Sequence, residues 1–129
     1  MSLFEASPFK VQGTQFVADF HECQCAPELL SSALVLEKSC EGLVVESGLT
    51  IVGKIFHQFV PGGATGLLLL AESHLAVHTW PEFASLSVDL YVCNVTQDNR
   101  EKATSVISAL QLLFLPQRVA AQTIERGVP

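Results

Sequence analysis

An apolar run from Gly66 to Leu70 leads into a polar segment from Glu72 to Glu82, and this junction constrains the fold more than any other feature. The run has the length of a buried strand and is too short for a long helix. Pro81 lies near the end of the polar segment, and proline cannot donate a hydrogen bond to a sheet ladder. We therefore expect a buried strand whose end opens onto a site with polar side chains.

The segment 72–82 is also dense in groups that carry chemistry. Two histidines, one serine, two carboxylates and the only tryptophan fall within these eleven residues. Charged residues make up only 16% of the chain, so this concentration is unusual for plain core. The segment is the strongest candidate for a functional site.

Alternation and helical spacing predict the elements of the first half of the chain. Residues 14–22 alternate as a strand with Phe16, Ala18 and Phe20 on one face. Pro27 can begin a helix that runs as far as Gly48, with Gly42 as a candidate break. A second strand is expected over 49–59, with a bulge or a close approach of chains at Gly53, and a turn over 61–63. The apolar positions of the expected helix are Leu29, Leu30, Ala33, Leu34, Cys40, Leu43 and Val44.

The second half continues with strands and one helix. Residues 87–93 alternate, with Val88, Leu90 and Val92 on one face and Cys93 on the polar face. Asp98 and Glu101 resemble a capping box that opens a helix closed by Pro116, and 118–124 forms a last strand before a tail without pattern. The order predicts one α+β domain over 1–129, a two-layer sandwich with helices on one face of a largely antiparallel sheet. The expected apolar stripe of the last helix is Ala103, Val106, Ile107, Leu110 and Phe114.

Composition limits the partners of the chain. Hydrophobic residues make up 49% of it, which leaves too few polar residues to cover a small globule and predicts a subunit interface. No apolar run approaches the roughly 20 residues of a membrane span, and no secretory signal is visible, so we expect a cytoplasmic protein without a membrane partner. A net charge of −6 with seven Lys and Arg argues against nucleic acid. The four cysteines do not form a disulfide framework and are expected to be reduced.

Taken one at a time, the candidate residues have ordinary alternatives. Ser73 would be a turn residue, and it lacks the glycine-flanked elbow of a hydrolase nucleophile. His74 and His78 have the spacing of a metal pair on a helix, but the segment reads as extended and no third ligand accompanies them, so we expect no metal. The alternative for Phe59 and Trp80 is core packing, and for Cys93 a small buried hydrophobe.

Read together, the same residues carry a resemblance. Ala71-Glu72-Ser73-His74, running on to His78-Thr79-Trp80-Pro81-Glu82 with Val88-Asp89-Leu90 and Cys93 behind it, resembles the bacterial and archaeal S-adenosylmethionine decarboxylase proenzymes. These are pyruvoyl enzymes of polyamine biosynthesis. The resemblance extends more weakly from Phe20-His21-Glu22-Cys23 to Glu125-Arg126-Gly127. It implies a decarboxylase with the α+β sandwich of that family, active as a homodimer of cleaved αβ units.

The resemblance implies that the chain cleaves itself between Glu72 and Ser73. The Ser73 hydroxyl attacks the Glu72 carbonyl to give an ester, and β-elimination and hydrolysis leave a pyruvoyl group at position 73. The products are a β chain of residues 1–72 and an α chain of 73–129. His78 matches the base for the Ser73 α-proton. Thr65 stands where the family has a serine that assists processing, and its extra methyl group is expected to slow that step.

The resemblance also implies roles in decarboxylation. The covalent pyruvoyl group forms a Schiff base with the substrate amine and draws off the electrons released with carbon dioxide, without pyridoxal phosphate. Cys93 matches the donor that protonates the product. Phe59 and Trp80 match the rings that stack on the adenine of S-adenosylmethionine and favour its sulfonium. Glu82 matches the carboxylate that holds the ribose hydroxyls.

Two departures from the family pattern leave alternatives open. Gln15 stands where members usually have a histidine, and Phe83-Ala84-Ser85-Leu86 replaces the usual aromatic-glycine-tyrosine. Relatives decarboxylate arginine or ornithine on the same scaffold. Such a basic substrate would need carboxylates, for which Glu22, Glu46 and Asp89 are candidates. A third hypothesis is a non-catalytic, unprocessed relative.

Overall fold

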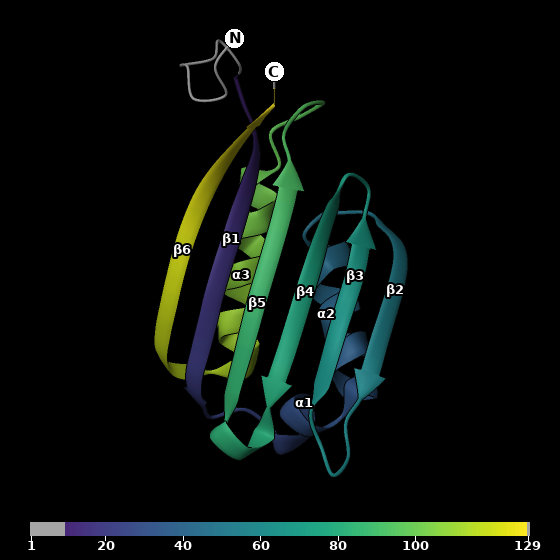
Figure 1. Ribbon diagram of the computed structural model, residues 1–129, viewed down its shortest axis with the longest axis vertical. Helices are drawn as coiled ribbons and strands as arrows, with labels where there is room; N and C mark the ends of the chain where they lie inside the picture. The colour runs from purple at the N-terminus through teal and green to yellow at the C-terminus, as the bar shows by residue number, and fades with distance from the viewer. Residues whose placement is uncertain (1–9, 129) are drawn as a thin grey trace, which may run out of the picture.

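Six antiparallel strands form a single sheet in the part of the chain that the computed structural model describes, residues 10–128 (Figure 1). They pair in the order β2-β3-β4-β5-β1-β6, and consecutive strands β2 to β5 are neighbours joined by short connections. The antiparallel sheet that alternation predicted is therefore confirmed. The strands are β1 (Lys10–Cys23), β2 (Ile51–Gln58), β3 (Ala64–Leu70), β4 (Ser73–Trp80), β5 (Ser85–Cys93) and β6 (Pro116–Val128).

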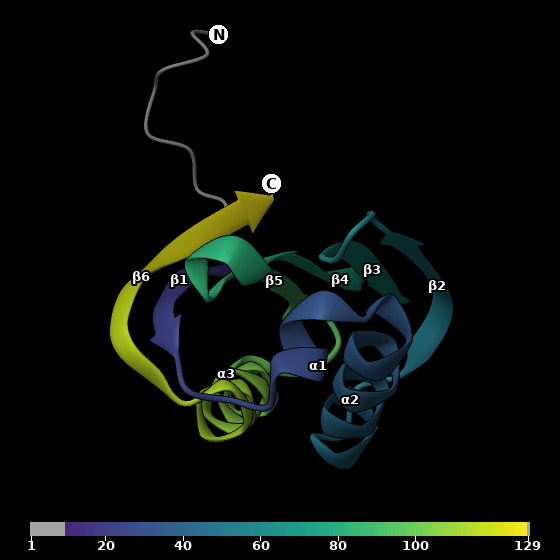
Figure 2. The same ribbon diagram turned by 90° about the horizontal axis from the view of Figure 1, so that it is seen from below.

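The helices cover one face of the sheet and leave the other free (Figure 2). They are α1 (Pro27–Ser31), α2 (Ala33–Glu46) and α3 (Arg100–Phe114), with a short 3-10 helix η1 (Pro81–Phe83) between β4 and β5. The predicted two-layer α+β architecture is confirmed. We call the uncovered side the helix-free face; it carries every second residue of the strands, including Gln15, Ile55, His57, Thr65, Leu67, Leu69, His74, Ala76, His78, Trp80, Asp89, Tyr91 and Cys93.

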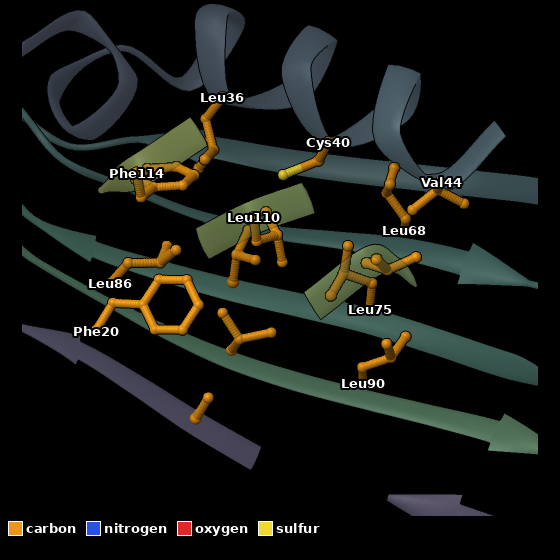
Figure 3. Packing of buried hydrophobic residues seen from close by; sticks show 14 of the residues in the cluster. Phe20, Leu36, Cys40, Val44, Leu68, Leu75, Leu86, Leu90, Leu110 and Phe114 are labelled. Atoms are coloured by element: carbon orange, nitrogen blue, oxygen red, sulfur yellow. The ribbon is translucent and has the colours of Figure 1, made fainter. Parts of the chain in front are cut away.

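The core lies between the sheet and the helices (Figure 3). Alternate residues of the strands point towards the helices, and the apolar stripes of α2 and α3 meet them. Burying one such side chain completely contributes about 1.5–3 kcal/mol. The largest completely buried residues are Phe20, Leu36, Leu68, Leu75, Leu86, Leu90, Leu110 and Phe114.

The first predicted helix breaks at a different residue. Gly42 lies inside α2, and the break is at Ser32, whose extended backbone separates α1 from α2 and whose Oγ accepts the Val35 N–H at 3.3 Å. Leu34 was predicted to be apolar core but is 59% exposed, and Leu36 takes its place. The shift follows from the break, because α2 starts with its own rotation about the helix axis.

Of three further predictions, those for the start of α3 and the end of the chain were wrong, and that for β2 is confirmed. Asp98 and Glu101 do not form a capping box, because the N-cap residue is Asn99 and the Asp98 carboxylate accepts the N–H of Arg100 at 3.0 Å. The tail was expected to have no pattern, but β6 continues to Val128 because it pairs with the whole of β1. The bulge at Gly53 is confirmed by a shift of register in β2.

Within residues 10–128, no helix is both long and apolar enough to cross a bilayer. All four cysteines are free thiols.

Candidate active site

The predicted site residues form two groups at opposite ends of the β3–β4 hairpin. The scissile group consists of Glu72, Ser73 and Cys93 and lies at the turn between β3 and β4. The pocket group consists of Phe59, Thr65, His78, Trp80 and Glu82 and lies at the other end of the same strands. In Figure 1 the turn between β3 and β4 is at the top of the hairpin and the β2–β3 loop is at the bottom.

Ser73 is the first residue of β4 and directly follows a strained position. Glu72 has a φ of 62°, in the left-handed region, which costs a residue with a side chain on the order of 1–3 kcal/mol. Ser73 is only 8% exposed, and its Oγ accepts a hydrogen bond from the Cys93 N–H at 3.1 Å. The serine hydroxyl is thereby held beside the peptide bond that joins it to Glu72.

Cys93 ends β5, and both of its backbone polar groups are engaged. Its N–H is bound to Ser73, and its carbonyl oxygen accepts a hydrogen bond from Nδ2 of Asn99 at 2.7 Å. Asn99 was not among the residues predicted from the sequence. Only the N-cap preference of asparagine could have drawn attention to it, and its side chain does not cap the helix.

The pocket group lines a pocket of about 350 Å³. Thr65 and His78 face each other across β3 and β4, and the Thr65 Oγ1 lies 3.1 Å from the His78 Nδ1. The rings of His78 and Trp80 are stacked with their centroids 6.1 Å apart. All five predicted residues line this pocket, together with Val60, Pro61, Gly62, Gly63 and Thr79.

Hydrogen bonds fix the β2–β3 loop that forms one wall of this pocket. The Gln58 side chain donates to the carbonyl oxygens of Ser31 and Gly63 at 2.8 and 3.0 Å, and the Phe59 N–H donates to Gly63 at 2.8 Å. The Phe59 side chain is 48% exposed and that of Trp80 is 40% exposed, so both leave ring surface open to an incoming molecule. A flat aromatic ligand can therefore lie against them.

The structure does not bring the two groups together within one chain. Thr65 pairs with His78, and Leu70 pairs with Ser73, five residues further along each strand. At about 3.4 Å per residue, His78 lies roughly 17 Å from Ser73. Cys93 is beside Ser73, but His78 cannot reach the serine of its own chain.

Burial keeps the cysteines outside the two site groups protonated. Burial is the main cause that raises the pKa of the Cys23 thiol to about 11 and that of Cys40 to about 12, and it also raises the pKa of Cys25. These three groups are neutral thiols near pH 7 and lie outside both site groups.

The candidate carboxylates for a basic amino acid lie away from the pocket. Asp89 accepts a hydrogen bond from Nε2 of Gln15 at 3.0 Å and lies 3.7 Å from His74. Glu22 pairs with Arg118 at 3.1 Å, and Glu46 is exposed at the end of α2. Their positions give no support to arginine or ornithine as the substrate.

The remaining departure from the family pattern adopts a defined turn. Ala84 follows η1 as its C-cap residue with a φ of 47°, in the left-handed region that glycine favours.

Among residues 10–128, no three histidine, cysteine or carboxylate side chains cluster in a way that could bind a metal ion.

Comparison with known proteins places these residues in a family context. The family model described as S-adenosylmethionine decarboxylase matches residues 14–127. The S-adenosylmethionine decarboxylase proenzyme of Thermotoga petrophila is 39% identical over 118 residues, which cover 92% of this chain and 86% of the relative. That of Thermosipho africanus is 32% identical over 122 residues, 93% of this chain and 92% of the relative.

Solved structures give the same result. The crystal structure of the adenosylmethionine decarboxylase from Aquifex aeolicus superposes with a TM-score of 0.83 at 32% identity, over 93% of this chain and 94% of that one. The monomer of Trypanosoma brucei AdoMetDC-delta26 superposes with a TM-score of 0.61 at 14% identity, over 84% of this chain and 44% of that one, and shows a shared fold alone.

Proposed function

The chain belongs to the S-adenosylmethionine decarboxylase family, and on this premise we propose that it is a proenzyme that cleaves itself and then decarboxylates S-adenosylmethionine. The proposal is carried by one observation: the same pocket contains all five predicted residues, Phe59, Thr65, His78, Trp80 and Glu82. Two aromatic rings suit the adenine and the sulfonium of S-adenosylmethionine, and a carboxylate suits its ribose hydroxyls. The product would be the aminopropyl donor for spermidine synthesis.

Self-processing would occur between Glu72 and Ser73. The Ser73 Oγ attacks the Glu72 carbonyl carbon, the peptide C–N bond breaks, and the nitrogen takes the hydroxyl proton. A base then removes the Ser73 α-proton, and the Cβ–Oγ bond breaks so that Oγ leaves within the new Glu72 carboxylate. The dehydroalanine left at position 73 tautomerises to an imine, and water hydrolyses it to the pyruvoyl group with release of ammonia. The left-handed backbone of Glu72 and the Cys93 hydrogen bond to Oγ support this assignment.

Position 73 fits the pyruvoyl group that this family carries. It begins a strand, so after cleavage the new chain end lies next to the turn where Ala71, Glu72 and Asn99 line a small pocket of about 260 Å³. A pyruvoyl group there would supply an electrophilic carbonyl and an electron sink for loss of carbon dioxide. Cys93 stands at the adjoining strand end and would deliver the proton that replaces the carboxylate.

The distance between the two groups supports a homodimer in which each site uses two chains. His78 lies roughly 17 Å from the Ser73 of its own chain by strand geometry, too far for proton transfer. Packing two helix-free faces together about a twofold axis that lies between the sheets and perpendicular to the strands sets the strand ends that carry Ser73 and Cys93 in one protomer opposite the pocket group of its partner, with Cys93 on the packed face. The same twofold rotation brings His78 of each protomer to the Ser73 end of the other, so both sites are completed together.

Mass spectrometry of the freshly purified protein tests the processing. We expect two fragments divided between residues 72 and 73, the second with a blocked pyruvoyl end. Release of carbon dioxide from carboxyl-labelled S-adenosylmethionine, compared with labelled arginine and ornithine, then tests the substrate. A chain that stays whole contradicts the processing, and a cleaved chain that acts only on a basic amino acid contradicts the substrate.

A further inference from the structure

Asn99 occupies the N-cap position of α3 without using its side chain as a cap. Asparagine is among the residues that cap helices best, because its side-chain oxygen accepts one of the free N–H groups of the first turn. Here the Asp98 carboxylate accepts the Arg100 N–H instead. The Asn99 side chain is therefore directed elsewhere at the expense of a favourable interaction.

The Asn99 side chain is directed at Cys93. Its Nδ2 donates to the Cys93 carbonyl oxygen at 2.7 Å, while its Oδ1 is buried and has no hydrogen-bond partner among the described residues. Turning the amide over would set Oδ1 against the Cys93 oxygen and lose the bond. The contact with Cys93 thus fixes the orientation of the amide and outweighs an unsatisfied acceptor.

This contact acts at the last residue of β5, where Cys93 is in register with Gly13 of β1. Beyond Cys93 the ladder stops, and the loop 94–99 makes separate contacts with β1. The Asn94 N–H donates to the Gln12 carbonyl oxygen at 2.6 Å, and the Asn94 Oδ1 accepts the Asn99 N–H at 2.9 Å. The loop is anchored to β1, and Asn99 transmits that anchoring to Cys93.

From Cys93 the chain of contacts reaches the scissile residue, because the Cys93 N–H donates to the Ser73 Oγ at 3.1 Å. We propose that Asn99 is a positioning residue for self-processing: it fixes Cys93 so that the Cys93 N–H holds the Ser73 hydroxyl for attack on the Glu72 carbonyl. The inference rests on the proposed function and adds a residue to it. Asn99 touches no reacting atom and acts through Cys93.

The test uses substitutions that keep a good N-cap but remove the donor. Serine and aspartate cap helices as well as asparagine does, and neither carries an N–H that can reach the Cys93 carbonyl. In Asn99→Ser and Asn99→Asp we expect the precursor, followed by mass after cell-free synthesis, to disappear about tenfold or more slowly than wild type. Gln24→Ser and Gln24→Asp make the same changes at an exposed residue outside both site groups, whose Nε2 donates to the Glu22 carbonyl oxygen at 3.2 Å, and should process at the wild-type rate.

A second measurement separates positioning from stability. In a Ser73→Ala background every chain should remain uncleaved, and there the Asn99 substitutions should lower the thermal midpoint by no more than the loss of one hydrogen bond explains, about 5 °C. If wild type cleaves and both Asn99 variants cleave at its rate, or are slow only in proportion to a lost midpoint, the inference is wrong. If wild type itself stays whole, the proposed function fails first.

Discussion

The Ser73 side chain combines near-complete burial with a single hydrogen bond from a backbone N–H. A reactive hydroxyl in such a place can be removed without removing much structure. Ser73→Ala should therefore leave a folded chain that remains whole, with a loss of stability of about 1 kcal/mol from the unpaired Cys93 N–H. Intact mass after long incubation and urea unfolding check the two parts. Any cleavage between 72 and 73 in this variant would refute the assignment of Ser73.

Cys93 offers its backbone to Ser73 and, as we propose, its thiol to the substrate. Because Cys93→Ala keeps the backbone N–H, it should still be cleaved. It should lose decarboxylation by roughly 10²-fold or more, the usual contribution of a positioned proton donor. Cys25→Ala, a matched loss of a partly buried thiol outside both groups, should keep full turnover. Near-normal carbon dioxide release from Cys93→Ala would move the protonation to another residue.

Among single residues, the sequence resemblance identified what lines the pocket but not what positions the serine. Trp80 and Glu82 belong to the central motif and Phe59 to the weaker part of the resemblance before it, and all three line one pocket. Asn99 was missed because its contact with Cys93 depends on the conformation of the loop 94–99. No periodicity records which way a side chain turns at the end of a helix.

Among the elements, the strands were more predictable than the first helix. Alternation marks a strand wherever one face is buried, so 87–93 and its buried face were found correctly. The break at Ser32 was missed because glycine is the more conspicuous breaker, although serine is a preferred N-cap. The exposed position of Gly42 inside α2 shows that a glycine on the solvent side of a helix weakens it without ending it.

Glycine substitutions in two elements should have opposite effects on stability. A Cβ on Gly66 of β3 would overlap with Cε2 of Phe56, whose ring covers this glycine from β2. Gly66→Ala must displace that ring, and we expect a loss of about 1–3 kcal/mol. A Cβ on Gly42 would meet nothing within 4 Å, so Gly42→Ala should gain about 0.5–1 kcal/mol from helix propensity.

Urea unfolding of both glycine variants, each made on the Ser73→Ala chain so that one species is compared, checks these signs. A stable Gly66→Ala would mean that Phe56 can move without loss. An unstable Gly42→Ala would mean that α2 needs the freedom of glycine at this position.

For the whole molecule, the helix-free face combines chemistry with unburied apolar surface. Ile55, Leu69 and Trp80 lie on it with 70%, 49% and 40% of their surface exposed. Large apolar side chains gathered on one side of a small protein indicate a contact surface. The high apolar content of the chain led to the same expectation. What the sequence could not reveal is the distance between the two groups, which makes the proposed dimer part of the active site.

Mixed dimers test whether each active site combines two chains. In a dimer of one Ser73→Ala chain and one His78→Ala chain, one site has lost both residues and the other keeps the intact Ser73 of one chain with the intact His78 of its partner. Co-expression with two different affinity tags and purification on both should yield mixed dimers with about half the activity of wild type, since one of two sites is complete. Each variant expressed alone should be inactive.

The matched control pairs two changes in the same group. In a mixed dimer of Ser73→Ala with Cys93→Ala, the scissile group of each chain is damaged, so a shared site cannot be completed and no activity should return. Restored activity in the first mixed dimer and none in the second would place His78 opposite the Ser73 of the partner chain. If the first mixed dimer is assembled and folded but also inactive, His78 does not act across the interface. His78 is then excluded as the processing base altogether, because roughly 17 Å of strand separates it from the Ser73 of its own chain.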